Sequence, residues 1–303
     1  MLGAVTKSVN AGPRASRLNP RWRRFFSDPV TVGALVVVIM LVLLAALAPW
    51  VAPHDPSVSF TDGLSDMGAP VGPGAHFWFG SDLLGRDLLS RVIWGARVSL
   101  LIGVLANGAA TVIGLSVGVV AGFFGGALAT LLMRLTDLMM AFPVLLLAIA
   151  LTAILTPSLL IVALVIALLN WVGLARVVYG LVLSLRNREF VLAAEALGAR
   201  PARILWRHVL PQLVSVTLVW ATLGISTSVM LEATLSFLGV GVQPPTPSWG
   251  GIINESQSYF TLSPWLIAFP GLMILVTALA FNLLGEGLRE ALDPTRRPGR
   301  VGY

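Results

Sequence analysis

Residues 98–123 read VSLLIGVLANGAATVIGLSVGVVAGF, and this stretch decides which class of protein the chain belongs to. No charged residue interrupts it. An α-helix needs about 20 predominantly apolar residues to cross the hydrocarbon core of a bilayer, so this stretch can span a membrane. Gly114, Gly118 and Gly122 recur every four residues and share one helix face. Small residues at this spacing let two membrane helices approach closely, and we interpret the stripe as a packing seam rather than a pore lining.

Further apolar segments of spanning length lie on both sides of this stretch. They predict an all-α integral membrane protein with six transmembrane helices, at roughly residues 30–50, 98–123, 128–156, 158–179, 212–236 and 264–285. The third and fourth segments meet at Pro157-Ser158, where a proline-led break predicts a tight turn at the membrane surface. The first segment follows several arginines, as in a signal peptide, but it has the length of a span, and we expect it to be retained.

The composition of the whole chain agrees with a lipid environment. Of the 303 residues, 56% are hydrophobic and only 11% are charged. The net charge of +6 is spread over segments between the apolar runs and forms no basic domain, so we expect no nucleic-acid partner. The chain has no cysteine, which excludes disulfides and thiolate metal ligands. We therefore expect neither a metal site nor a directly bound cofactor.

The distribution of basic residues predicts the orientation in the membrane. Lys and Arg concentrate in cytoplasmic segments. With the N-terminus inside, only Arg86, Arg91 and Arg97 of the 20 Lys and Arg residues lie outside. The bases then assigned to the inside include Lys7, Arg14, Arg17, Arg134, Arg176, Arg186, Arg188, Arg200, Arg289, Arg296, Arg297 and Arg300. We expect a multi-pass protein of a bacterial or archaeal cytoplasmic membrane, with both termini in the cytoplasm.

This topology divides the chain into consecutive parts. They are a cytoplasmic segment 1–29, a first transmembrane helix 30–50, an extracytoplasmic loop 51–97, a five-helix core 98–286 and a cytoplasmic tail 287–303. In the loop, Asp87, Arg91 and Ile93 predict a short amphipathic helix at the membrane surface. This helix is expected either to anchor the loop on lipid or, with the proline-rich turn 243–249, to form a docking surface for a partner protein.

The core contains one long polar insertion, predicted to be cytoplasmic, at residues 180–211. Its second part, residues 186–211, reads RNREFVLAAEALGARPARILWRHVLP. Glu189 to Leu197 predicts a helix, Gly198 suits the position just after its end, and Pro201 suits the first turn of a second helix running to His208 before Pro211. The apolar residues of this pair suggest a protein-binding face. They are Phe190, Val191, Ala194, Leu197, Ile204 and Leu205.

Several motifs identify a family. Ala193-Ala194, Gly198 and the closing Leu210-Pro211 resemble the cytoplasmic signature loop of permease subunits of binding-protein-dependent ATP-binding-cassette (ABC) importers. The stretches FGSDLLGRD at residues 79–87 and EATLSFLG at residues 232–239 resemble the dipeptide, oligopeptide and nickel branch. The first span, which ends in Ala-Pro-His-Asp-Pro at residues 52–56, resembles the extra segment of that branch's C-type subunit. The resemblance covers residues 20–295 and departs at Leu192 and His208.

The resemblance implies a type I ABC importer permease fold and a set of partners. The helix pair would be a coupling pair, docked into a cleft of an ATPase whose closure switches the membrane helices between two states. The expected partners are a second homologous permease, two ATP-binding subunits and an extracytoplasmic substrate-binding protein. The residues expected at the ATPase-coupling loop are Glu189, Ala193, Ala194, Gly198, Arg203, Arg207, Leu210 and Pro211. The alanines and the glycine would form a tight joint, and Glu189 and the two arginines would make polar contacts.

The energy source is also expected to lie outside the chain. No Gly-x-x-x-x-Gly-Lys-Ser/Thr phosphate loop occurs in the sequence, so we expect partner subunits to bind and hydrolyse ATP, and the chain not to be an enzyme. Proton-driven carriers mark their pathway with buried ionisable groups, which are scarce in these spans. We expect import of dipeptides or oligopeptides. The alternatives are a nickel chelate or a glutathione-like substrate, a stand-alone channel or carrier, and a membrane scaffold without transport.

Two sets of polar residues in the spans remain to be explained. Arg134 and Asp137 are three residues apart and are predicted to form a structural ion pair. Ser226, Ser228 and Glu232 lie on the most polar span and are candidates for a translocation pathway, in which Glu232 would guide a peptide amino group. The alternative is that Glu232 pairs with Arg91 or Arg97.

Overall fold

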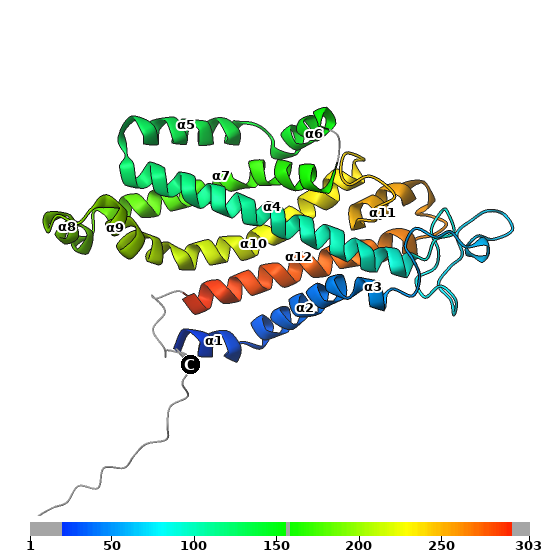
Figure 1. Ribbon diagram of the computed structural model, residues 1–303. Helices are drawn as coiled ribbons and strands as arrows, with labels where there is room; N and C mark the ends of the chain where they lie inside the picture. Colours follow the sequence, from blue (N-terminus) through cyan, green and yellow to red (C-terminus); the bar gives the residue numbers. More distant parts are fainter. Residues whose placement is uncertain (1–19, 156–157, 293–303) are drawn as a thin grey trace, which may run out of the picture.

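The computed structural model describes residues 20–155 and 158–292, and within these ranges the chain is helical with irregular loops (Figure 1). The helices are α1 (Pro20–Ser27), α2 (Pro29–Ala46), α3 (Ala48–Val51), α4 (Leu88–Phe124), α5 (Gly126–Ala141), α6 (Val144–Ile154), α7 (Leu159–Arg186), α8 (Glu189–Ala196), α9 (Pro201–Ile204), α10 (Leu210–Phe237), α11 (Trp249–Ser256) and α12 (Trp265–Leu292). A π-helical turn, Leu205–Val209, joins α9 to α10, and 3₁₀ turns occur at Thr61–Gly63 and Gln257–Tyr259. The predicted turn residue Pro157, the basic residues 1–19 and 293–303, and the ends of the predicted segments 1–29 and 287–303 lie outside the described residues.

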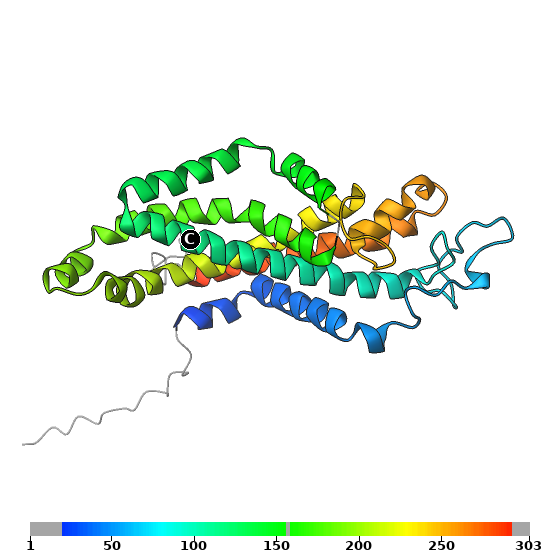
Figure 2. The same cartoon turned by 45° about the horizontal axis from the view of Figure 1, so that its top comes forward.

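The long helices form an elongated bundle with two different ends (Figures 1 and 2). One end carries α8 and α9 and is called here the α8–α9 end. The opposite end carries α11 and the irregular segment 52–87 and is called here the α11 end. The C-terminal end of α12 and helix α1 are placed toward the α8–α9 end (Figure 1).

Five helical stretches have the length and hydropathy of membrane spans. They are residues 29–46, 88–124, 159–186, 201–237 and 265–292. These stretches confirm five of the six predicted spans. At the N-terminal end of the first one, the Asp28 carboxylate accepts hydrogen bonds from the Val30 and Thr31 N–H groups and from the Thr31 hydroxyl, and these bonds hold the pKa of Asp28 below its ordinary value.

The third predicted span, residues 128–156, is not one continuous helix. Helices α5 and α6 make an angle of 91° to each other and are separated by Phe142 and Pro143. Proline has no N–H to donate, and it forces the preceding residue out of the helical region, as the extended backbone of Phe142 (φ −93°, ψ 138°) shows. Residues 20–155 and 158–292 therefore contain six candidate spans only if this bent pair is counted as one.

The second span begins earlier than predicted. Helix α4 starts at Leu88, and at about 1.5 Å per residue its 37 residues extend about 55 Å. The predicted amphipathic helix is therefore the first part of α4 rather than a separate helix, while the position of the membrane boundary at residue 97 stays a prediction. Asp87 caps the new start by accepting a hydrogen bond from the Ser90 N–H at 2.9 Å, while Arg91 and Ile93 are buried rather than on a membrane surface.

The glycine stripe of α4 is a packing seam against α7, as predicted. A Cβ atom added at Gly114 would lie 2.6 Å from the Trp171 carbonyl oxygen, and one added at Gly118 would lie 2.5 Å from the Ala175 carbonyl oxygen. Both distances are shorter than any side chain tolerates. The two backbones therefore touch along the seam, which is the contact that small residues permit between membrane helices.

Charged residues at the α11 end form a buried network that cancels its own charge. Arg86 Nε lies 2.6 Å from Asp82, and Arg86 and Arg91 contact Glu255 of α11 at 2.8 and 2.9 Å. Arg91 also pairs with Asp82, and its side chain is only 2% exposed. Two arginines facing two carboxylates meet the requirement that buried charges be paired, and they tie the segment before α4 to α11.

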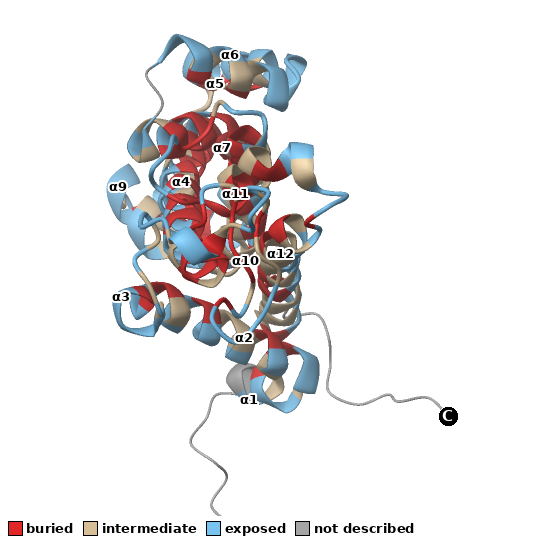
Figure 3. Cartoon of the chain, turned by 90° about the vertical axis from the view of Figure 1, so that its right-hand side faces the viewer, coloured by how far each residue is buried: buried red, intermediate tan, exposed pale blue. Residues whose placement is uncertain are grey.

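The helices at the centre of the bundle are the most buried, and those at its periphery are the most exposed. Buried residues concentrate in α4, α7 and α10, whereas α5, α6 and the outer side of α2 are largely exposed (Figure 3). Most of the exposed residues there are apolar, for example Leu131 at 68%, Leu146 at 64% and Met40 at 62%. Apolar surface of this extent is expected where lipid is the solvent.

The seam generates a stability prediction. Gly118→Val places a branched side chain where the Ala175 carbonyl lies and should cost about 1–3 kcal/mol through overpacking. Gly108→Val, on the same helix, meets no atom within 4 Å and serves as the matched control. We expect the detergent-solubilised Gly118 variant to lose several degrees of melting temperature while the control melts like the native chain. Equal melting temperatures would contradict a close-packed seam.

Candidate functional site

The first helix of the candidate site forms as predicted. Helix α8 covers Glu189–Ala196, and Gly198 follows it with a φ of +76°, in the left-handed region that favours glycine. The Gly198 N–H donates to the Glu195 carbonyl at 2.9 Å, and the Ala199 N–H donates to the Ala194 carbonyl at 3.0 Å. These two bonds are the Schellman arrangement that closes a helix C-terminus.

The second helix differs from the prediction, because it does not end before Pro211. Helix α9 begins at Pro201, passes through the π-helical turn and continues into α10. Pro211 cannot donate a hydrogen bond, and its ring crowds the carbonyl four residues earlier. The π turn relieves this conflict by widening the helix, and the Leu210 N–H donates to the Leu205 carbonyl five residues back. The pair is therefore a short helix followed by the first turns of a long one.

The predicted apolar face of the pair divides into an anchor and an exposed surface. Val191 and Ile204 are 2% and 4% exposed and pack with Val182, Val209 and Leu213, so they hold the pair on α7 and α10. Their assignment to a binding face was wrong. The exposed apolar residues of the pair are Phe190 at 43%, Leu192 at 50%, Leu197 at 88% and Trp206 at 72%. Leu192 and Trp206 were missed, since burial at a helix joint depends on contacts that the sequence does not display.

The other predicted coupling residues lie on the surface of the pair. Glu189, Ala193, Arg203, Arg207 and Pro211 are exposed, while Ala194 and Leu210 are half-buried. Within residues 20–155 and 158–292, none of the three charged side chains has an ion-pair partner. The structure thus leaves two guanidinium groups and a carboxylate available at the α8–α9 end, and their role in coupling stays a prediction.

The three candidate pathway residues on α10 face the interior of this chain. Ser226 donates a hydrogen bond to the Ala278 carbonyl at 3.2 Å, and Ser228 accepts one from Asn170 Nδ2 at 3.1 Å. Glu232 is 0% exposed, and its Oε1 accepts a hydrogen bond from the Ser236 hydroxyl at 2.7 Å. The three side chains thus line no open surface, and their role in translocation stays a prediction.

Of the two predicted ion pairs, the one between Arg134 and Asp137 is present, whereas the alternative pairing of Glu232 is absent from the described residues. Glu232 pairs with neither outer arginine, because Arg91 belongs to the charge network of the α11 end and Arg97 lies 5.5 Å from the centre of the Trp94 ring. The predicted ion pair of Arg134 with Asp137 is present at 4.0 Å, and Asp137 also pairs, more closely, with Arg176 of α7. The Arg176 contact spans two helices, so local spacing gave no signal for it.

Two protein-family models match parts of the chain. Residues 114–298 match the family described as "Binding-protein-dependent transport system inner membrane component". Residues 17–70 match "N-terminal TM domain of oligopeptide transport permease C". The chain belongs to the binding-protein-dependent permease family. It is thus a multi-pass inner membrane protein and a non-catalytic component of a system that also contains an ATPase and a binding protein.

Similar proteins cover nearly the full length of the permease. It is 42% identical over 280 residues, 92% of each chain, to the di/tripeptide transport system permease protein DppC of Pseudomonas aeruginosa. It is 39% identical to the dipeptide transport system permease protein DppC of Alkalihalophilus pseudofirmus, over 90% of each chain. It is also 43% identical to the glutathione transport system permease protein GsiD of Escherichia coli O157:H7, over 90% of this chain and 89% of that one.

A solved structure confirms the predicted fold. A chain of the inward-facing MetNI methionine ABC transporter aligns with a TM-score of 0.54 at 20% identity, covering 68% of the permease and 97% of that chain. The permease therefore has the ABC importer permease fold.

The joint at Gly198 generates a local prediction. Gly198→Ala puts a Cβ atom on a backbone with positive φ, which costs about 1 kcal/mol, or roughly a fivefold rise in local opening. Hydrogen exchange of residues 189–199 should accelerate by that factor. Gly180→Ala in α7, where nothing lies within 4 Å of an added Cβ, should leave exchange unchanged. Unaltered exchange in the Gly198 variant would contradict the closing role of this glycine.

Proposed function

We propose that the permease imports dipeptides or other short peptides across the cytoplasmic membrane, using ATP hydrolysed by its partners. The observation that carries the proposal is the identity of 39 to 43% to peptide and glutathione permeases over about nine-tenths of the chain. Two of these relatives are named for peptides of two or three residues, and one for glutathione. Glutathione is the second candidate substrate, because one of the three relatives described above is named for it.

The proposed orientation places the α8–α9 end and both termini in the cytoplasm. The α8–α9 end carries Arg186, Arg188, Arg200, Arg203 and Arg207. At the α11 end, by contrast, Arg86 and Arg91 are neutralised by Asp82 and Glu255. Unpaired basic residues near membrane helices favour the cytoplasmic side, so this distribution supports the orientation. The segment 52–87 and α11 then face outward, where a substrate-binding protein docks.

The proposed assembly contains a second homologous permease and two ATP-binding subunits. The sequence has no phosphate loop, so ATP is bound by those subunits. The exposed residues Phe190, Leu197 and Trp206 form, with Arg203 and Arg207, a mixed apolar and basic surface at the α8–α9 end. A surface of aromatic, aliphatic and arginine side chains has the composition of a protein interface, and an ATPase cleft is the proposed occupant.

Co-purification and transport test the assembly together. The tagged permease, extracted from native membranes in mild detergent, should bring down a second permease and ATP-binding subunits identified by mass spectrometry. In proteoliposomes that also contain the binding protein, alanylalanine uptake should require ATP. Recovery of the permease alone, with uptake of the dipeptide in ATP-free liposomes, would replace the proposal by a channel or secondary carrier.

The coupling surface has its own test. Gly198→Arg strains the joint and adds a bulky cation beside the proposed ATPase contact. We expect the variant to reach the membrane in normal amount but to lose most ATP-dependent uptake, at least tenfold, and most binding of the ATPase. Gly180→Arg, an exposed helical glycine of α7 with open space around it, is the control for an added arginine. Unchanged uptake and ATPase binding in the Gly198 variant would contradict the assignment of the α8–α9 end as the ATPase-coupling surface.

A further inference from the structure

Three helices bring uncharged polar side chains to one pocket near the middle of the bundle. The pocket has a volume of about 270 Å³, and its polar lining is Asn107 and Thr111 of α4, Asn170 of α7 and Thr227 of α10. Each of these residues lies well inside its helix, far from both ends. Polar groups at membrane depth are costly and are usually retained for packing or for function.

The packing role uses only part of each carboxamide. Asn107 Nδ2 donates to the Ala221 carbonyl, and Asn170 Nδ2 donates to the Ser228 hydroxyl. Neither carboxamide oxygen accepts a hydrogen bond from any residue that the structure describes, although Asn107 is only 6% exposed. Each amide also keeps one N–H beyond the bond it makes. Two acceptors and two donors thus remain to be satisfied at this pocket, which makes it a site for a polar ligand.

The backbone of α10 is adapted to this arrangement. Gly224 also lines the pocket, and a Cβ atom there would lie 2.0 Å from Asn107 Oδ1. Any larger residue would push the Asn107 carboxamide out of its place. The glycine therefore keeps the polar side chain between α4 and α10.

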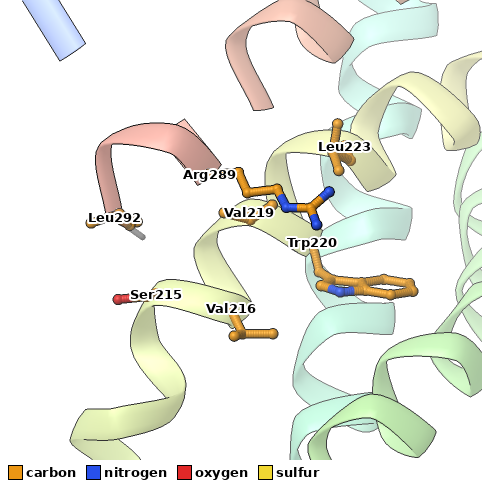
Figure 4. Close-up of a pocket in the computed structure, with 7 residues that line it drawn as sticks. All are labelled: Ser215, Val216, Val219, Trp220, Leu223, Arg289 and Leu292. Carbon is orange, nitrogen blue, oxygen red and sulfur yellow. The ribbon is translucent and has the colours of Figure 1, made fainter. Parts of the chain in front are cut away.

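A second and larger pocket adjoins the first on the side of the α8–α9 end. It has a volume of about 510 Å³, and Trp220 and Leu223 line both pockets. Arg289 extends into it from the last turn of α12 toward Trp220 (Figure 4). No described residue forms an ion pair with Arg289. A neutral polar pocket and a cationic one thus share Trp220 and Leu223 in their linings.

Resting on the proposed function, we propose that the pocket lined by Asn107, Asn170 and Thr227 binds the backbone of the peptide in transit, and that Arg289 receives its carboxylate beyond Trp220. A carboxamide presents a donor and an acceptor side by side, which complements a peptide group and ignores substrate side chains. The uncharged side chains of Asn107, Asn170 and Thr227 bind the peptide weakly enough for it to be released, as passage through a transport pathway requires. The two adjoining pockets, of about 270 and 510 Å³, together fall within the roughly 300–1,000 Å³ of small-molecule sites, which is enough for one short peptide.

Cysteine labelling tests occupancy directly, because the chain contains no cysteine of its own. Thr227→Cys introduces a thiol at the pocket, and Thr222→Cys is the matched control on the same helix, outside the pocket lining. Both threonines donate to the carbonyl four residues earlier, at 3.2 and 2.9 Å. In the reconstituted complex with binding protein and ATP, excess alanylalanine should slow maleimide labelling of Thr227→Cys at least threefold and leave Thr222→Cys unchanged.

The outcomes separate this inference from the proposed function. ATP-dependent uptake together with unprotected labelling of Thr227→Cys would overturn the pocket assignment and leave the importer standing. Absence of ATP-dependent alanylalanine uptake by the native complex would overturn both.

Substitution at Asn170 provides the second readout. Asn170→Leu keeps the size but removes the carboxamide, and alanylalanine uptake should fall at least tenfold while the yield of the assembled complex stays normal. Asn170→Gln restores the carboxamide and should recover a substantial part of the uptake. Uptake at the native rate in the leucine variant would overturn the proposal.

Discussion

The contact between α4 and α7 is the constraint on which the rest of the structure depends. In lipid, moving an apolar side chain from lipid contact to protein contact lowers the free energy little, because lipid tails are also apolar. Two membrane helices therefore associate through close backbone packing rather than through the hydrophobic effect. Glycines at Gly114, Gly118 and Gly122 provide that approach. Helix α10 packs on this pair, α2 and α12 complete one side, and α5 and α6 lie on the other (Figure 3).

Different interactions stabilise the two ends of the bundle. At the α11 end, Asp82, Arg86, Arg91 and Glu255 form a buried network of short, charge-assisted contacts, which are directional and resist displacement. At the α8–α9 end, the helix pair is held by apolar contacts such as that of Val191, and these contacts adapt more readily to sliding. A rigid α11 end with a more adaptable α8–α9 end suits a subunit of a transporter that changes shape.

Sequence reasoning succeeded where one local rule decides the outcome. Hydropathy located five spans because lipid demands helices with apolar surfaces, and Gly198 was recognised because the left-handed joint after α8 favours glycine. It failed where two rules compete or where the contact is distant. Pro143 broke a helix that hydropathy alone made continuous, whereas Pro211 was absorbed by a π turn. The Asp137–Arg176 pair and the pocket at Asn107 depend on tertiary packing, which local spacing does not reveal.

The π turn between α9 and α10 also fixes how many residues the chain must have there. Residues 201–237 form one helical stretch, in which each residue advances the direction of all later side chains by about 100°. Deleting one residue from 205–209 would remove the widened turn and rotate α10 relative to α8. The face that bears Ser228 and Glu232 would then turn away from the bundle interior. Natural variation in chain length should therefore be absent from this turn and should gather in the irregular segment 52–87, where no such register is kept.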